Sequence, residues 1–161
     1  MNKTIIFIFG FLSVFISSHA QEGEAPLRKG EKQLNFGLGF SSHGLPTYFG
    51  IDFAVHDDWT LGPVARIIFD DDNDPGPDDD PGVHFGALGR VDYHWNRLLN
   101  IPSNWDFYLG ANLGVISGNN VDLDLGLQIG GRWYWNNKWG LNLEFGGGTG
   151  YGSSLGVSVK L

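Results

Sequence analysis

Apolar and polar residues alternate with a period of two along most of this chain. Between residues 83 and 95 the odd positions are Val83, Phe85, Ala87, Gly89, Val91, Tyr93 and Trp95. Between residues 121 and 135 they begin Val121, Leu123, Leu125, Leu127 and Ile129. This alternation is the pattern of a β-strand with one apolar face, and no run repeats with the longer period of a helix.

Eight such runs follow one another, separated by short turn-forming segments. They are Gln33–Phe40, Thr47–His56, Trp59–Phe69, Val83–Trp95, Trp105–Ile116, Val121–Trp135, Trp139–Thr149 and Ser153–Leu161. Most of them supply the roughly nine to eleven residues that a tilted strand needs to cross a bilayer. We therefore predict an all-β fold over residues 33–161, an eight-stranded antiparallel up-and-down transmembrane β-barrel.

The composition of the second face favours a membrane barrel over a soluble one. In the run 121–135 the even positions are Asp122, Asp124, Gly126, Gln128, Gly130, Arg132 and Tyr134. A soluble barrel would expose this face to water, where repeated glycine is unusual. Glycine pointing inward instead makes room in an eight-stranded cylinder, whose interior is just wide enough for side chains. We predict that the hydrocarbon face meets lipid.

All six tryptophans fall at junctions on one end of the predicted barrel. They are Trp59, Trp95, Trp105, Trp133, Trp135 and Trp139. Indole prefers the boundary between hydrocarbon and water, so we interpret this set as an aromatic girdle on the periplasmic side. A weaker girdle is expected at the outer end, formed by Phe40, Phe49, Phe69, Phe85 and Tyr151.

Eight charged residues fall on the inward face of the runs. They are Asp52, Arg66, Arg90, Asp92, Asp106, Arg132, Glu144 and Lys160. Four bases and four acids in a narrow lumen are expected to pair, because an unpaired buried charge is costly. A structural plug follows from that pairing. The alternative is a conducting or proton-relaying lumen, for which eight strands leave little width.

The first twenty residues have the features of a cleaved secretory signal. Lys3 provides the positive start, Ile5–Ile16 the apolar core, and Ser18-His19-Ala20 a small-residue cleavage site. Residues 21–32 form a polar lead-in that we place in the periplasm. These features predict export to the outer membrane of a Gram-negative bacterium. The chain has no cysteine, which excludes disulfides and thiolate chemistry.

The charge of the chain is acidic and locally concentrated. The whole chain carries a formal net charge of −8, and seven of its 18 acidic residues lie between Asp70 and Asp80. Nucleic acid demands a basic surface, so it is excluded as a partner. The expected partners are outer-membrane lipid and lipopolysaccharide.

The acidic segment 69–82 is the one candidate metal site. The candidate ligands among its seven carboxylates are Asp70, Asp72, Asp74, Asp78, Asp79 and Asp80. Alternate spacing resembles the start of an EF-hand, but Pro75 replaces the turn glycine and Pro81 the closing glutamate, which excludes a true EF-hand. We expect no cofactor. Weak Ca²⁺ binding stays open as an alternative to a solvated, self-repelling loop, with ion bridging to lipopolysaccharide as one use.

Two long stretches resemble a known family. "DYHWNRLLNIPSNWDFYLGANLG" and the ending "IGGRWYWNNKWGLNLEFGGGTGYGSSLGVSVKL" are similar to small eight-stranded outer-membrane barrels of the OmpA/OmpX-like kind, in particular the single-domain "outer membrane protein beta-barrel" family. The resemblance covers 33–161. It implies a membrane-embedded barrel with a structural or interaction role in the envelope.

We predict a non-enzymatic barrel with a plugged lumen, alone or as an accessory subunit of a larger outer-membrane complex. The first alternative is a lipid-modifying enzyme, for which Ser41, Ser42 and His43 would need an orienting acid. The second is a narrow channel.

His84 and His94 lie ten residues apart on one run, roughly 33 Å by strand rise, so they cannot share a metal. The apolar turn Asn96–Asn104 either packs on the barrel rim or docks a partner.

Overall fold

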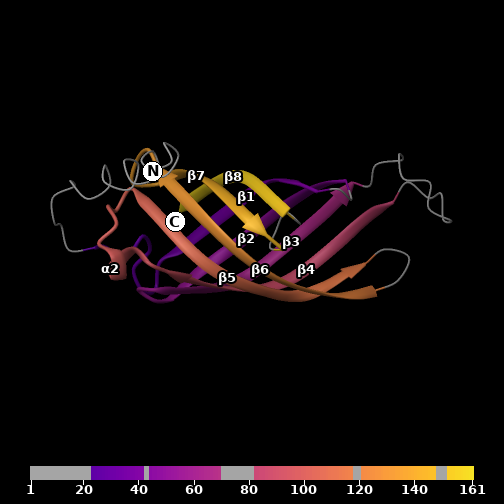
Figure 1. The fold of residues 1–161 in the computed structure, drawn as a ribbon, viewed down its shortest axis with the longest axis horizontal. Coiled ribbons are helices and arrows are strands. Elements are labelled where there is room, and N and C mark those ends of the chain that lie inside the picture. Colours follow the sequence, from indigo (N-terminus) through magenta and orange to yellow (C-terminus); the bar gives the residue numbers. More distant parts are fainter. Residues whose placement is uncertain (1–22, 42–43, 70–81, 118–120, 148–151) are drawn as a thin grey trace, which may run out of the picture.

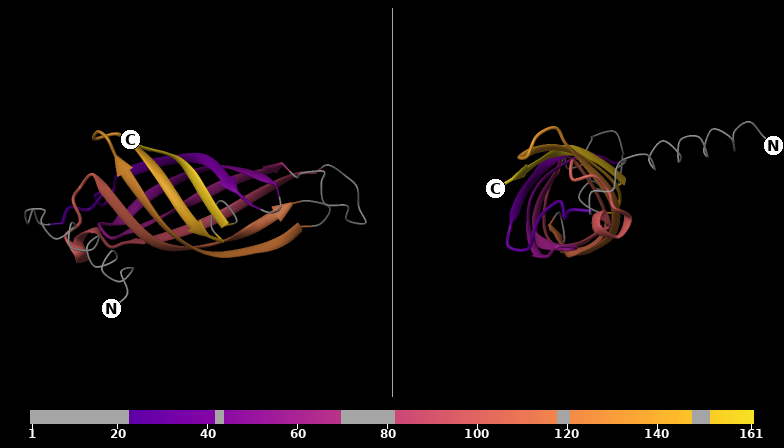
Figure 2. Two further views of the ribbon diagram at one scale, coloured as in Figure 1. Left: turned by 45° about the horizontal axis from the view of Figure 1, so that its top comes forward. Right: turned by 90° about the vertical axis from the view of Figure 1, so that its left-hand side faces the viewer.

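The computed structural model describes residues 23–41, 44–69, 82–117, 121–147 and 152–161. They form one closed barrel in which each strand pairs antiparallel with the next and β1 pairs with β8. The strands are β1 (Lys32–Phe40), β2 (Leu45–His56), β3 (Trp59–Phe69), β4 (Val83–His94), β5 (Trp105–Ser117), β6 (Val121–Tyr134), β7 (Trp139–Gly146) and β8 (Gly152–Lys160). Figure 1 shows the barrel from the side, and the right-hand view of Figure 2 shows its ring of strands. The predicted eight-stranded up-and-down barrel is confirmed.

Seven of the eight strands lie within two residues of their predicted bounds, and β7 is the exception. It ends at Gly146 instead of continuing to Thr149. Gly146 has a φ of 118°, a left-handed conformation that glycine adopts without a steric penalty. The strand therefore ends at Gly146, although the alternation in the sequence continues past it.

The barrel wall is consequently uneven. β5 and β6 have 13 and 14 residues, whereas β7 has 8 and β8 has 9. Pairing between β6 and β7 runs from Tyr134↔Gly140 to Gln128↔Gly146. The first half of β6 reaches beyond β7, as Figure 1 and the left-hand view of Figure 2 show.

The two faces of the strands follow the predicted alternation. Outward apolar side chains are exposed on every strand, and inward side chains are buried. Most of the buried interior is polar or charged, and the apolar part is a small cluster of Tyr48, Val64 and Leu88. This inversion of the usual soluble core is expected of a barrel that is surrounded by hydrocarbon.

The lead-in packs against the end of the barrel that carries the tryptophans, which we call the tryptophan end. Leu27 is only 2% exposed. The Gly30 amide donates to the Ala54 carbonyl at 2.8 Å, and the Ala54 amide donates to the Glu31 carbonyl at 3.0 Å. These bonds extend the edge of β2, so the lead-in is held in place although its sequence is mostly polar.

A single helical turn, α2 (Asn96–Leu99), connects β4 to β5 at the same end. Asn96 is fully buried, and its side chain bonds the backbone of Trp105 and Phe107. Leu98 and Leu99 are 69% and 60% exposed, so they do not pack on the rim. No helix among the described residues has the length and apolar character needed to cross a membrane.

Candidate functional site: the polar lumen

All eight strands contribute polar side chains to the lumen, and these side chains are at most 9% exposed. They are Gln33, Asn35, Asp52, Thr60, Arg66, Arg90, Asp92, His94, Asp106, Asn112, Asp124, Gln128, Arg132, Asn142, Glu144, Ser154 and Ser158. Each lies on the inward face because side chains of a strand point alternately to its two sides. Buried polar groups must find partners, so the lumen is a hydrogen-bonded network.

Arg132 joins three strands near the tryptophan end. Its Nη2 lies 2.9 Å from Asp52 Oδ2 on β2, and its Nη1 lies 2.8 Å from Asp106 Oδ2 on β5. The guanidinium carbon lies 4.3 Å from the centre of the Tyr108 ring. One cation thus neutralises two carboxylates from different strands while an aromatic face covers it.

Arg90 forms a second centre beside Tyr108. Its Nε donates to Asp92 at 2.6 Å, and its Nη2 lies 2.6 Å from Glu144 Oε2. The Tyr108 hydroxyl donates to the same Glu144 oxygen at 3.1 Å. The Arg90 guanidinium carbon lies 5.2 Å from the Tyr108 ring centre, so this ring contacts both cations.

Thr60, His94 and Asp106 form a chain that has the geometry of a hydrolytic triad. Thr60 Oγ1 lies 3.0 Å from His94 Nε2, and His94 Nδ1 lies 2.7 Å from Asp106 Oδ1. All three residues are at most 2% exposed, and Asp106 also binds Arg132. A catalytic nucleophile needs open space beside it for a substrate, and these three buried side chains have none. We therefore interpret the three hydrogen-bonded residues as a structural link between β3, β4 and β5.

Neutral side chains connect further strands across the lumen. The Tyr48 hydroxyl donates to Asn142 Oδ1 at 2.7 Å, joining β2 to β7. Asn142 donates to Ser158 at 3.0 Å, and Ser158 donates to Asn35 at 2.7 Å. The Tyr134 hydroxyl donates to Gln33, which joins β6 to β1. Non-neighbouring strands are therefore tied together through the centre of the barrel.

Arg66 and Asp124 form an ion pair in the half of the barrel away from the tryptophans. Arg66 Nη1 lies 2.8 Å from Asp124 Oδ2, with side-chain exposures of 0% and 9%. The two strands, β3 and β6, are not neighbours, so this pair also crosses the lumen. It lies apart from the network around Arg132 and Arg90.

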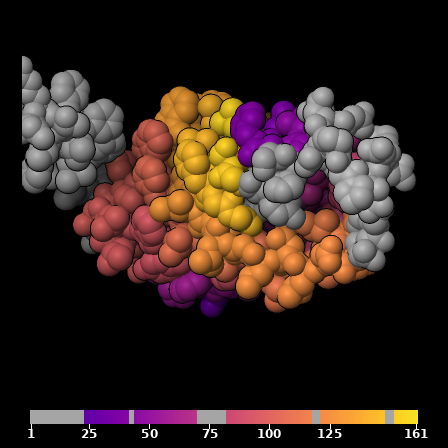
Figure 3. Space-filling model, turned by 45° about the vertical axis from the view of Figure 1, so that its right-hand side comes forward, coloured from indigo at the N-terminus to yellow at the C-terminus, as the bar shows by residue number. Residues whose placement is uncertain are grey.

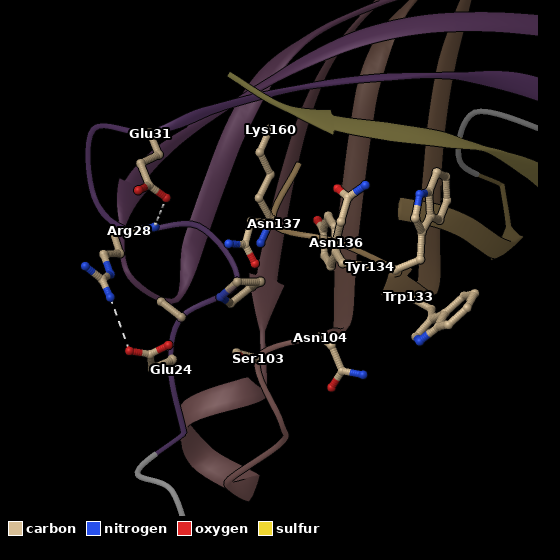
Figure 4. A pocket seen from close by; sticks show the side chains of 13 residues that line it. Glu24, Arg28, Glu31, Ser103, Asn104, Trp133, Tyr134, Asn136, Asn137 and Lys160 are labelled. Atoms are coloured by element: carbon tan, nitrogen blue, oxygen red, sulfur yellow. Dashed lines mark hydrogen bonds and ion pairs between the residues drawn. The ribbon is translucent and has the colours of Figure 1, made fainter. Parts of the chain in front are cut away.

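Lys160 differs from the other seven predicted lumen charges. It is partly exposed, and its Nζ lies 3.9 Å from the centre of the Tyr134 ring. It lines a pocket of about 720 Å³ at the tryptophan end. Figure 4 shows Glu24, Arg28 and Glu31 of the lead-in on one side of this pocket and Lys160 with two asparagines opposite. The structure thus places this cation at the barrel mouth.

The tryptophans lie at one end of the strands, and several of their rings touch. Trp59 contacts Tyr93 at 5.0 Å between ring centroids, and Trp133 lies 6.4 Å from both Trp105 and Trp135. Trp139 is 40% exposed at the start of β7, and Trp95 follows β4.

Three phenylalanines of the expected outer girdle, Phe40, Phe69 and Phe85, lie at or near the opposite strand ends. Phe49 lies deeper in the wall, opposite Phe36 and Ala65, because β2 begins two residues earlier than predicted. Tyr151 is outside the described residues.

Several members of the network were absent from the eight predicted lumen charges, among them His94, Tyr108 and Asp124. The alternation does put all three on the inward face. The pairing of Asp124 with Arg66 became identifiable only after closure of the barrel brought β3 and β6 together. Tyr108 carries no charge, so a search for charged residues passes over it.

Several candidates fall outside the described residues. These are Ser42, His43 and the acidic residues Asp70, Asp72, Asp74, Asp78, Asp79 and Asp80. Ser41 forms a bridge with Gly44. His84 and His94 lie at opposite ends of β4, as their spacing predicted. In the described part of the chain, no three His, Asp or Glu side chains gather as metal ligands would.

Comparison with known proteins identifies the fold alone. No protein-family model matches the chain, and no curated protein matches it. A de novo designed transmembrane β-barrel superposes with a TM-score of 0.61 at 13% identity, covering 83% of this chain and 98% of the designed one. Ail, the attachment invasion locus protein of Yersinia pestis, aligns with a TM-score of 0.37 at 10% identity over 82% of this chain and 95% of Ail. The designed barrel places the chain in the fold class of transmembrane β-barrels.

Proposed function

We propose that this chain is a non-enzymatic outer-membrane β-barrel whose lumen is plugged and whose role in the envelope is structural and interactive. The observation that carries the proposal is the side-chain network that joins all eight strands across the lumen. A pore needs a continuous path of water, whereas these side chains bond one another through the middle of the cylinder.

The charges of the network argue against a conducting lumen. The acids around Arg132 and Arg90 come from β2, β4, β5 and β7, and each lies within 2.9 Å of a guanidinium nitrogen. An ion that entered would have to break pairs whose members cannot be resolvated in so narrow a space. Charges that are satisfied in this way stabilise the barrel instead of guiding ions.

The outer wall supports placement in lipid. Its exposed side chains are aliphatic or aromatic on every strand, and tryptophans mark one end. Together with the predicted secretory signal, this wall supports the outer membrane of a Gram-negative bacterium as the location, with outer-membrane lipid and lipopolysaccharide as neighbours. A barrel without a pore or an open catalytic cavity acts through its surfaces, which supports the role of an accessory subunit of a larger complex.

Planar-bilayer recording tests the plugged lumen. The purified barrel is reconstituted at a density at which a porin, added as a positive control, gives stepwise currents. The proposal expects no stepwise current from this chain over a wide range of voltage. Regular conductance steps that depend on the protein would overturn it in favour of the channel alternative. Fractionation of the producing cells, with recovery in the outer-membrane fraction, tests the location independently.

A further inference from the structure

The pocket at the tryptophan end lies between the lead-in and the rim of the barrel. The lead-in crosses the mouth from β1 toward α2, where the Gly23 amide donates to Asn100 Oδ1 at 3.4 Å. It contributes Glu24, Arg28 and Glu31 to the pocket, and the opposite side consists of strand ends and connections. The volume of about 720 Å³ falls within the range of about 300–1,000 Å³ that is typical of small-molecule sites.

Two charged side chains of this pocket, Glu31 and Lys160, form no ion pair with a described residue. Arg28 and Glu24 pair with each other at 3.1 Å. Glu31 Oε2 accepts from the Arg28 amide at 2.8 Å, which fixes the position of the carboxylate. The Lys160 ammonium lies over the Tyr134 ring, but this contact uses only one side of a group with three N–H donors. Figure 4 shows the resulting arrangement, an acid on the lead-in and a cation on the barrel.

Neutral hydrogen-bond donors lie on the same side of the pocket as Lys160. Asn136 Oδ1 accepts from the amides of Lys138 and Trp139 at 2.8 and 2.7 Å, so the side-chain NH₂ of Asn136 remains a donor. Further donors come from three other side chains that line the pocket, Ser103, Asn104 and Asn137. An ammonium accompanied by amide and hydroxyl donors suits the several acceptor oxygens of a phosphate group.

The pocket also reaches the lipid-facing side of the barrel. Tyr134 points inward and is buried, whereas Trp133 and Trp135 are 40% and 47% exposed, and all three residues line the pocket. A cavity that is lined from both sides of the end of β6 passes around that end. Tryptophans of membrane proteins lie at the level of the lipid headgroups. A headgroup can therefore enter this pocket while its acyl chains remain on the outer wall.

The outer wall next to the pocket is suited to acyl chains. Leu141 of β7 lies directly opposite Trp133, and Leu143 of β7 lies opposite Leu155 of β8. These three leucines are 43% to 49% exposed. Figure 3 shows the orange residues of β7 and the yellow residues of β8 side by side on this wall. The wall thus offers hydrocarbon directly beside a polar pocket.

We propose that this pocket binds a zwitterion of phosphate and primary ammonium, the chemistry of a phosphoethanolamine headgroup. The phosphate lies beside Lys160 and the asparagine amides, and the ammonium donates to Glu31. A phosphocholine headgroup has no N–H to donate, and a phosphoglycerol headgroup brings no cation to Glu31. The inference rests on the proposed location in lipid and assigns a headgroup to the tryptophan end of the barrel.

Competition among lipids with identical acyl chains tests the pocket. The chain is purified in a non-ionic detergent and mixed with equal amounts of the phosphoethanolamine, phosphocholine and phosphoglycerol lipids. Native mass spectrometry then identifies the first lipid that the protein retains. The phosphoethanolamine lipid should be enriched about five- to tenfold over each of the others, because only this lipid forms both charge-assisted contacts.

Two variants separate the two ends of the headgroup. Lys160→Gln removes the cation and should lower retention of the phosphoethanolamine lipid about five- to tenfold. Glu31→Gln keeps the phosphate contact and should abolish the preference over phosphocholine. Tryptophan fluorescence and the midpoint of urea unfolding show that each variant is folded before its lipids are compared.

Two controls carry the same chemical changes outside the pocket. Lys138→Gln alters the connection between β6 and β7 at a residue that does not line the pocket. Asp57→Asn alters an acid that accepts the Lys29 amide at 2.9 Å, much as Glu31 accepts the Arg28 amide. Both controls should retain lipids as the unchanged chain does.

Free phosphoethanolamine, added as a competitor, distinguishes the source of the ligand. Weaker binding of the free compound than of the lipid would assign a lipid headgroup, and equal binding would assign a soluble zwitterion. Equal retention of the three lipids by the unchanged chain would overturn the proposal, as would equal losses in Lys160→Gln and Lys138→Gln.

This result is separable from that of bilayer recording. Conductance would refute the plugged lumen and leave the headgroup pocket untouched. Absence of a headgroup preference would refute the pocket and leave a closed lumen in place.

Discussion

The two ends of this barrel are built differently. At the tryptophan end all eight strands are paired, the lead-in covers part of the rim, and Arg132 binds two carboxylates. At the opposite end the strands have unequal lengths, Arg66 and Asp124 form an ion pair across the lumen, and among the described residues no strand pairs with residues 121–125 of β6 on the β7 side. The difference indicates that the bonded lumen network is concentrated toward the tryptophan end.

A single residue, Gly146, contributes much to this asymmetry. β7 ends there, and among the described residues the first half of β6 has no strand partner on that side, although both strands are complete near the tryptophans. Closure of the barrel needs only the paired part of each strand.

The largest loss of stability is expected from removing Arg132, the cation that pairs with two carboxylates. Arg132→Ala leaves Asp52 and Asp106 buried beside no guanidinium, and should lower the free energy of unfolding by about 3–5 kcal/mol. Urea unfolding in detergent, followed by tryptophan fluorescence, measures this. Arg97→Ala is the control, because Arg97 is 46% exposed beside Asp57 and Asp58. Its cost should stay below about 1 kcal/mol, and equal costs would contradict a core centred on Arg132.

The ion pair at the other end should be replaceable as a unit. Asp124→Leu alone removes a carboxylate that lies 2.8 Å from the buried Arg66 guanidinium and should cost about 3 kcal/mol, whereas the double change with Arg66→Leu should recover most of that loss. The same unfolding assay applied to both singles and the double variant gives the coupling. If the double variant is as unstable as the sum of the singles, the two side chains do not stabilise the barrel as a pair.

Lumen packing is tested by two glycines that face opposite ways. A methyl group at Gly130 would strike the Tyr108 ring, whereas at Gly89, on the lipid side, it would meet only the Leu113 carbonyl at 3.8 Å. Gly130→Ala should therefore destabilise the barrel by about 1–3 kcal/mol, while Gly89→Ala should stay within about 0.5 kcal/mol. Tolerance of both changes would mean that the lumen is loosely filled.

The smallest effect concerns one hydrogen bond across the lumen. Tyr48→Phe removes the hydroxyl that donates to Asn142 and should cost about 1 kcal/mol. Tyr93→Phe, on the outward face beside Trp59, is the matched control and should change the unfolding midpoint less. An equal shift in the two variants would remove the distinction between the bonded lumen and the lipid-facing wall.

The sequence was sufficient to predict the strands and their faces, because alternation fixes which side chains share a side. It could not predict which inward residues meet. Arg66 and Asp124 are brought together by closure of the cylinder, which depends on the stagger between strands and not on local pattern. The alternation places Lys160 on the inward face of its strand. Because Lys160 is the last residue of β8, its side chain lies at the mouth of the barrel at the tryptophan end.

The end of β7 at Gly146 was likewise not predictable from the sequence. Phe145, Gly147 and Thr149 continue the alternation, so the pattern predicted a strand that continued to Thr149. Glycine is compatible with a strand and with a turn, and only the left-handed φ of Gly146 decides between them. Hydrophobic patterning predicts where strands can be, and backbone conformation determines where they stop.

The most direct test of a filled lumen is the reactivity of a thiol placed inside it. Ser158 is fully buried among Asn35 and Asn142, and Ser103 is exposed on the connection to β5. Ser158→Cys and Ser103→Cys are each treated with a small charged methanethiosulfonate reagent in the folded and the unfolded state. A filled lumen predicts that Ser158→Cys reacts only after unfolding, while Ser103→Cys reacts at once. Equally rapid labelling of both cysteines in the folded barrel would contradict it.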